Sequence, residues 1–136
     1  MATRTPDDAP VSGMLYVDED GLRWHMDTRL PVAAYTSQAK GFFGSKNAGW
    51  AAGGFVGPAL HGGGYDSPAN RGRLLRAVEM AKGKACTANQ IALAYLMSRP
   101  FAVFPIIGTS KPERAKEAMA AASIRLSEAE CAALCG

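Results

Sequence analysis

Residues 101–117 read FAVFPIIGTSKPERAKE, an apolar run that passes through a glycine into a polar, charged stretch. The run Phe101–Ile107 is typical of a parallel-sheet strand that is covered on both faces. Pro105 removes one backbone donor from this strand, so we expect a bulge or an unpaired position there. Ser110 with Glu113 three residues later forms a capping-box pattern, which predicts a helix as far as about Ala122. The stretch therefore predicts one strand followed by one helix.

Similar signals lie on both sides of this unit. The further expected elements are a helix from Asp18 or Asp20 to Thr28, a buried strand over Val32–Tyr35, a helix from Ser67–Pro68 to about Gly83, a buried helix opened by a Thr87/Gln90 capping box, and a short last helix opened by Ser127 and Glu130. Strands that alternate with helices predict an α/β fold. Two strands are too few to close such a sheet.

Residues 41–66 form a glycine-rich stretch without a periodic pattern, which predicts a long loop. Loops of this length are usually lids, binding loops or mobile segments, and the Phe and Trp side chains in this one argue against a pure linker. Residues 1–13 are rich in Pro, Asp and Thr and are expected to form a disordered tail. Residues 14–136 then form one domain.

Composition excludes several classes of function. The 136 residues carry a formal charge of +3, and the basic residues are scattered, so nucleic acid is not an expected partner. No apolar run approaches the roughly 20 residues that span a bilayer, and the N-terminus does not resemble a signal peptide, so we expect a cytoplasmic protein that does not enter a membrane. Three cysteines and two histidines without metal-ligand spacing predict reduced packing thiols and no metal site.

A candidate anion site follows the second strand. Gly108 leaves room for a ligand, Thr109 and Ser110 offer hydroxyls, and the free N–H groups of a helix start come next. Ser110, Arg114 and Glu117 would share one helix face, where Arg114 is suited to a phosphate and Glu117 to an exocyclic amine. The alternative is that Ser110 only caps the helix and that the two charged residues form a solvated face.

A second candidate cluster follows the first strand, in the sequence YTSQAKG over residues 35–41. The ring of Tyr35 beside the hydroxyls of Thr36 and Ser37 is suited to stacking on a planar group and binding a diphosphate. The alternative is a core tyrosine before an ordinary polar turn. Both clusters come at the carboxyl ends of strands, where ligand sites gather in α/β folds. No acid–base constellation stands out: His25 is expected to lie on a helix surface or to pack, and His61 to lie in a loop.

Two separated segments resemble the aldo-keto reductases. AYTSQAKGFF, residues 34–43, resembles the segment after strand 7 of that family, and residues 87–134 resemble its last helix, strand 8 and closing helices. Residues 14–30 resemble the piece before strand 7 in a bacterial subgroup. The family is a (β/α)8 TIM barrel that reduces aldehydes and ketones with NADPH. The resemblance therefore implies a partial barrel, the C-terminal segment only, and NADP(H) as cofactor.

The resemblance also assigns cofactor-binding roles by position. Tyr35 would stack on the nicotinamide, and Glu117 would bind the adenine amine, although Ala118 stands where relatives often have Asn. The remaining assigned residues contact the ribose and diphosphate (Thr36, Ser37, Gln38 and Lys46) or the 2′-phosphate end of the adenosine (Gly108, Thr109, Ser110 and Arg114).

The family's catalytic Asp, Tyr, Lys and His come from the first half of the barrel, so the resemblance assigns no catalytic residue to this chain. A whole barrel takes about 250 residues. One hypothesis is therefore a cofactor-binding portion that depends on an N-terminal portion of the barrel, with self-association as another route to cover the sheet. The alternative is a non-catalytic remnant that acts as a small α/β interaction module.

Overall fold

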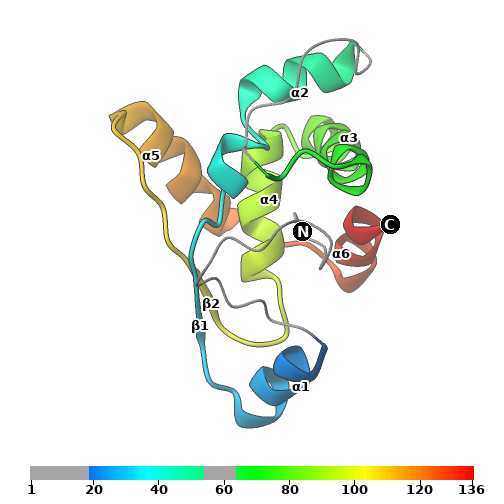
Figure 1. Ribbon diagram of the computed structural model, residues 1–136. Helices are drawn as coiled ribbons and strands as arrows, with labels where there is room; N and C mark the ends of the chain where they lie inside the picture. Colours follow the sequence, from blue (N-terminus) through cyan, green and yellow to red (C-terminus); the bar gives the residue numbers. More distant parts are fainter. Residues whose placement is uncertain (1–18, 54–63) are drawn as a thin grey trace.

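The computed structural model describes residues 19–53 and 64–136 (Figure 1). The helices, strands and short 3-10 turns follow one another as α1 (Glu19–Thr28), β1 (Val32–Ala34), η1 (Ala39–Gly41), α2 (Ser45–Ala52), α3 (Pro68–Gly83), α4 (Ala88–Met97), β2 (Val103–Pro105), α5 (Pro112–Ala120), η2 (Ala121–Ser123) and α6 (Glu128–Cys135). The tail expected over residues 1–13 lies outside the described residues, as does His61. No helix within the described ranges is both long and apolar enough to cross a membrane.

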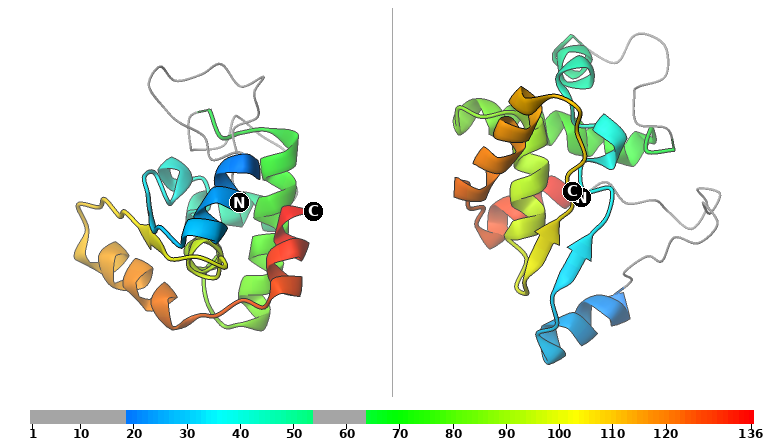
Figure 2. Two further views of the ribbon diagram at one scale, coloured as in Figure 1. Left: turned by 90° about the horizontal axis from the view of Figure 1, so that it is seen from below. Right: turned by 90° about the vertical axis from the view of Figure 1, so that its left-hand side faces the viewer.

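β1 and β2 pair in parallel, with Val32 opposite Val103 and Ala34 opposite Pro105. Val32 N donates to Ala102 O at 2.9 Å, and Ile106 N donates to Ala34 O at 3.0 Å. Helices α2, α3 and α4 lie between the two strands in the chain, so the pair is joined by a helical crossover, as expected for an α/β fold. The right-hand view of Figure 2 shows the two strands between α1 at one end and the remaining helices at the other.

Pro105 continues the strand without a bulge, so of the two expected outcomes the bulge is wrong and the position that is not hydrogen-bonded to β1 is the one observed. Along a parallel strand, every second residue forms its backbone hydrogen bonds with the same neighbouring strand. In this sheet Ala102 and Ile106 form theirs with β1, and Pro105 lies between these positions. Pro105 therefore directs its ring nitrogen away from β1, towards the outer edge of the described sheet. The missing N–H costs the β1–β2 ladder nothing.

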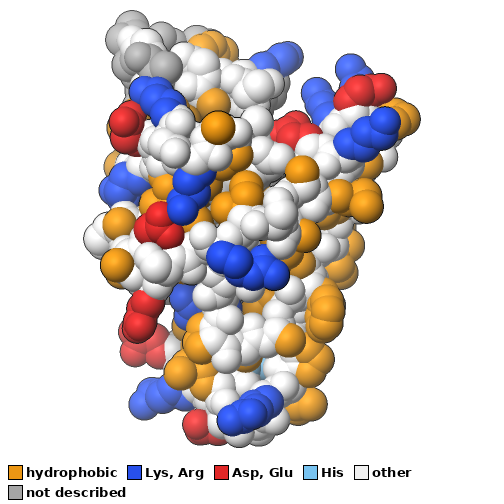
Figure 3. Space-filling view, turned by 180° about the vertical axis from the view of Figure 1, so that it is seen from behind, with side chains coloured by type: hydrophobic (Ala, Val, Ile, Leu, Met, Phe, Trp, Pro, Cys, Tyr) orange, Lys and Arg blue, Asp and Glu red, His pale blue; other side chains and the backbone are white. Residues whose placement is uncertain are grey.

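The expectation that both strands are buried is wrong in the described structure. Phe104 is 63% exposed, Ile106 49% and Tyr35 76%. Helix α4 packs against β2, whereas the middle residues of the two strands, Ala33 and Phe104, are exposed on the other face. Figure 3 shows hydrophobic side chains gathered along the side of the molecule that carries α5 and the strands.

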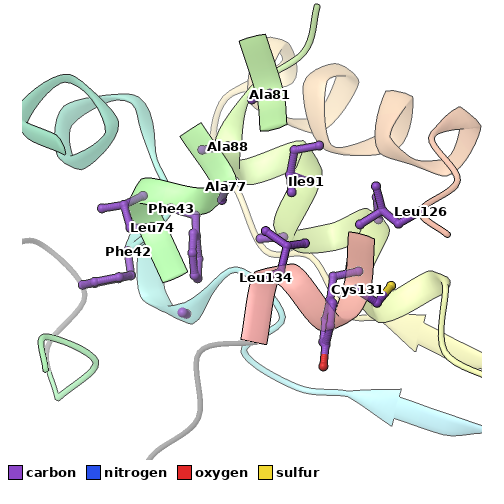
Figure 4. Close-up of a cluster of buried hydrophobic side chains, with 14 of the residues drawn as sticks. Phe42, Phe43, Leu74, Ala77, Ala81, Ala88, Ile91, Leu126, Cys131 and Leu134 are labelled. Atoms are coloured by element: carbon purple, nitrogen blue, oxygen red, sulfur yellow. The ribbon is translucent and has the colours of Figure 1, made fainter. Parts of the chain in front are cut away.

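The main core lies among α3, α4 and α6, with side chains from the segment around η1 inserted beside them (Figure 4). Ile91 and Leu93 are buried on α4, as the all-round apolar pattern of that helix predicts. Leu74 on α3 and Leu134 on α6 are both fully buried. This core fixes α4, which in turn supports β2 and α5.

Three of the five predicted helix starts are confirmed with their caps. Helix α1 ends at Thr28 as predicted, but the residue before Glu19 lies outside the described residues, so its cap stays a prediction. Ser67 caps α3, with Pro68 in its first turn, and complete capping boxes open α4 at Thr87 and α6 at Ser127. The capping box predicted at Ser110 is wrong: Lys111 occupies the N-cap position of α5, without a side-chain cap. Pro112 explains the difference, because it fits the first helical position and holds the preceding residue in an extended conformation.

The glycine-rich segment is not a loop throughout. Helix α2 occupies Ser45–Ala52, so the loop prediction over 41–66 is wrong there, and residues 54–63 lie outside the described structure. Phe42 and Phe43 enter the core just before this helix. The buried Asn47 side chain donates to Phe42 O at 2.9 Å and ties the helix to that anchor. Tertiary packing thus stabilises a helix with weak intrinsic propensity.

Helix α1 closes the amino end of the strand pair (Figure 1). The His25 ring stacks on Phe101 with a centroid distance of 5.4 Å, and Trp24 meets His25 edge-on at 4.9 Å. His25 Nδ1 lies 2.9 Å from Leu30 O. These contacts agree with the interpretation of His25 as a packing residue.

Candidate functional site

The segments that follow the two strands leave the sheet at the same edge, because β1 and β2 are parallel. A hydrogen bond joins them directly: Ser37 Oγ donates to Ile106 O at 2.7 Å. The structure thus brings the cluster that begins at Tyr35 beside the one that begins at Gly108. Their proximity was expected from the rule that strand ends of one direction share an edge.

The first segment turns sharply after Tyr35. Thr36, Ala39 and Lys40 all have positive φ, at 54°, 47° and 51°. This conformation is uncommon for residues with a Cβ and costs backbone energy, so it persists only where surrounding structure imposes it. Ala39 is itself buried, which fixes the turn from within. The turn presents the side chains of Thr36 and Ser37 beside the strand end.

A cavity of about 140 Å³ lies against this turn. Its lining residues come from the strand end and from the helices below it: Ala34, Tyr35, Thr36, Ser37, Ala39, Phe43, Tyr65, Ala92 and Leu96. A space of this size accommodates about one aromatic ring. Tyr35 is largely exposed, so the alternative of a core tyrosine does not hold, and its ring is accessible at the cavity wall.

The second segment, Gly108–Ser110, is exposed and non-helical. Thr109 Oγ1 accepts a hydrogen bond from Lys111 N at 3.2 Å, so Thr109 rather than Ser110 stabilises the approach to α5. Because α5 begins at Pro112, Ser110 does not share a helix face with Arg114 and Glu117 as predicted. Its hydroxyl remains in the exposed connection between β2 and α5.

Arg114 lies in the first turn of α5, and its side chain is exposed. The start of a helix carries a partial positive charge, which favours anions there. Lys111 adds an exposed cation at the N-cap, against Glu113 in the first turn. This end of α5 is suited to a phosphate group.

Glu117 differs from Arg114, because it is half-buried and contacts α4. Its carboxylate oxygen Oε1 accepts from Thr87 Oγ1 at 2.6 Å, and its backbone carbonyl accepts from Gln90 Nε2 at 2.9 Å. The alternative of a solvated face therefore describes Arg114 but not Glu117. The sequence identified Thr87 only as a helix cap, and its contact with Glu117 was not predicted.

Gln38 and Lys46 lie further along the first segment. Gln38 Nε2 approaches Asn89 Oδ1 at 3.5 Å, which places Gln38 over the first turn of α4. Asn89 is 8% exposed, and no sequence pattern distinguished it. Lys46 lies on α2 with an exposed side chain. The structure thus places Gln38 with the strand-end cluster and Lys46 on a separate element.

The cysteines form no candidate centre. All three are free, and burial raises the pKa of the Cys86 and Cys131 thiols above their usual range. A thiol with a raised pKa is protonated at neutral pH and is a poor nucleophile and a poor metal ligand. Within residues 19–53 and 64–136, no three His, Cys, Asp or Glu side chains gather as metal ligands would.

Comparison with known proteins gives one family assignment. The model of the aldo/keto reductase family matches residues 19–135, from the first residue of α1 to the last residue of α6. No solved structure matches the chain.

Proposed function

Since the family model covers well over half of its residues, the chain belongs to the aldo/keto reductase family of oxidoreductases, and we propose that it is the NADP(H)-binding C-terminal portion of such a reductase. In this proposal β1 and β2 are the seventh and eighth strands of a (β/α)8 barrel. The bound nicotinamide supplies the hydride that converts a carbonyl to an alcohol. The described residues bind and orient the cofactor.

The observation that carries this proposal is the meeting of the two strand-end segments, tied by Ser37 Oγ and Ile106 O. An accessible ring at Tyr35 stands at one side of this edge, beside a cavity that fits one planar ring. An exposed Arg114 stands at a helix start on the other side. A dinucleotide needs both features: stacking at one end and charge compensation at the other.

The proposal requires other strands to complete the sheet. The exposed side chains of Phe104 and Ile106 lie where a barrel has its covered strand surface. We expect an N-terminal barrel portion to supply that cover, together with the catalytic acid group. The protein then acts in the cytoplasm, where its cofactor is available.

The same exposed surface supports the second candidate function, a non-catalytic α/β module that binds another protein. Exposed apolar residues on the strand pair favour association with a partner. The two candidates differ in nucleotide binding, because a module that binds only proteins has no need of the cations around Arg114.

Titration of adenosine 2′,5′-bisphosphate and of AMP tests the proposal. Arg114→Ala is expected to weaken binding of the bisphosphate about ten- to a hundredfold and to leave AMP nearly unchanged, because a charge-assisted hydrogen bond contributes roughly 1.5–3 kcal/mol. Lys116→Ala is the matched control: it removes the same charge from the same helix, but two positions on, where side chains point to another face. Equal losses for both ligands, or equal effects of the two variants, would contradict the proposal.

A further inference from the structure

Thr87 has two roles in the structure. It is the N-cap of α4, where its Oγ1 accepts a hydrogen bond from Gln90 N at 3.2 Å. The same hydroxyl donates to Glu117 Oε1 at 2.6 Å. A hydroxyl has one hydrogen and two lone pairs, so both bonds can form at once. The cap bond uses a lone pair, and the single hydrogen is committed to Glu117.

Gln90 holds the backbone of the same glutamate. Its Oε1 accepts from Thr87 N at 2.9 Å, and its Nε2 donates to Glu117 O at 2.9 Å. The start of α4 therefore holds Glu117 by two hydrogen bonds, one to its carboxylate and one to its backbone carbonyl. These bonds fix both the position and the rotation of the side chain, which lies half-buried between α4 and α5.

This arrangement leaves acceptor capacity for a ligand. An ionised carboxylate offers about four lone-pair sites, and Thr87 occupies one of them. A glutamate that is already held in one rotamer loses less side-chain entropy when a ligand binds than a free one. Such a carboxylate accepts a hydrogen bond from an amino group but repels a carbonyl oxygen, because both of those oxygens are acceptors.

We propose that Thr87 is a positioning residue for base recognition: it orients the Glu117 carboxylate so that the site prefers a 6-amino purine to a 6-oxo purine. The inference rests on the proposed cofactor site and assigns a role to a residue outside the two strand-end segments. Thr87 acts through Glu117 and does not itself touch the base.

The test compares adenosine 2′,5′-bisphosphate with its inosine counterpart, which carries an oxo group in place of the amine. The wild-type chain is expected to prefer the adenosine ligand by about tenfold or more, the ratio that a hydrogen bond to a charged group produces. Thr87→Val, which removes the hydroxyl, is expected to abolish most of this preference. Thr87→Ser, which retains the hydroxyl, is expected to keep it.

Two further variants separate base recognition from folding. Thr87→Asp keeps an oxygen that caps α4 but has no hydrogen to donate, so it is expected to remain folded and to lose the preference. Arg114→Ala is expected to weaken both bisphosphates equally and leave their ratio unchanged.

The outcomes distinguish the inference from the function on which it rests. An unchanged adenosine-to-inosine ratio in Thr87→Val and Thr87→Asp would overturn the role of Thr87 while leaving the cofactor site intact. A loss of the ratio in Thr87→Ser would also overturn it. Failure of the wild-type chain to bind either bisphosphate would overturn the cofactor site and the inference together.

Discussion

At the scale of single residues, Tyr95 shows how a polar group is accommodated inside the helical core. It is 7% exposed, its hydroxyl lies 3.1 Å from Cys135 Sγ, and it accepts a hydrogen bond from Arg99 at 3.3 Å. The Arg99 guanidinium also lies over the Tyr95 ring, 5.6 Å from its centre. Burial, together with the hydrogen bond to Cys135, raises the pKa of Tyr95 to about 12.

This raised pKa predicts a loss of stability in alkali. In the unfolded chain a tyrosine ionises near pH 10, whereas folded Tyr95 stays protonated until about pH 12. The stability contributed by Tyr95 is therefore complete below pH 10 and falls by roughly 2 kcal/mol as the pH rises to 12. Denaturant unfolding of wild type and Tyr95→Phe from pH 8 to pH 12 measures this loss as a change in the difference between their free energies of unfolding.

Tyr95→Phe should be less stable than wild type at pH 8 by about 0.5–1.5 kcal/mol, because it lacks the two hydrogen bonds. The gap between the two proteins should narrow or reverse towards pH 12. A gap that stays constant over this range would contradict the prediction.

At the scale of elements, helix starts divide into those that follow local pattern and those that do not. Ser127 caps α6 as its spacing to Glu130 predicts, because the box depends only on residues three apart. Ser110 has the same spacing to Glu113, but Pro112 moves the start of α5 to itself. A proline inside the box therefore takes precedence over the box pattern.

Paired substitutions at these two serines test that difference. Ser127→Ala is expected to lower the free energy of unfolding by about 0.5–2 kcal/mol, because it leaves an amide of the first turn without its partner. Ser110→Ala is the matched control at an exposed, non-capping position, and its effect should stay within about 0.5 kcal/mol. Thermal and denaturant unfolding of both variants measures the difference. Similar losses in the two proteins would show that Ser110 does cap α5.

Elements that depend on tertiary contacts were the least predictable. The glycine-rich pattern predicted a loop where α2 forms, because α2 is stabilised by the neighbouring Phe42 anchor and by the buried Asn47. In the candidate site, the meeting of the strand ends was predictable because parallel strands share an edge. The contact of Thr87 with Glu117 was not, because it spans thirty residues and depends on how α4 packs against α5.

At the scale of the whole molecule, a well-packed group of helices carries a sparsely covered pair of strands. The core around α4 is buried, whereas Phe104, Ile106 and Tyr35 are largely exposed on or beside the strands. Large exposed apolar side chains next to an unpaired strand edge favour association. The described part of the molecule therefore has a surface that is suited to a partner.

We expect the isolated chain to self-associate in a concentration-dependent way. Sedimentation or size-exclusion analysis over a series of protein concentrations should show species larger than a monomer, and Phe104→Glu should shift the series towards monomer. Leu75→Glu is the matched control: it places the same charge on an exposed leucine of α3, away from the strands, and should leave association unchanged. A sharp monomer at every concentration would contradict this prediction.

The direction of Pro105 gives the molecule a built-in limit on growth. Two-stranded sheets with two unpaired edges can pair with one another edge to edge. A head-to-tail contact of that kind forms a filament unless it closes into a ring. Pro105 turns towards the outer edge of β2, where it withholds the donor that a further strand would need. A further copy of the chain therefore finds one backbone donor fewer at this edge, which disfavours its addition there. The same proline that leaves the β1–β2 ladder undisturbed thus disfavours the growth of fibres through the outer edge of β2.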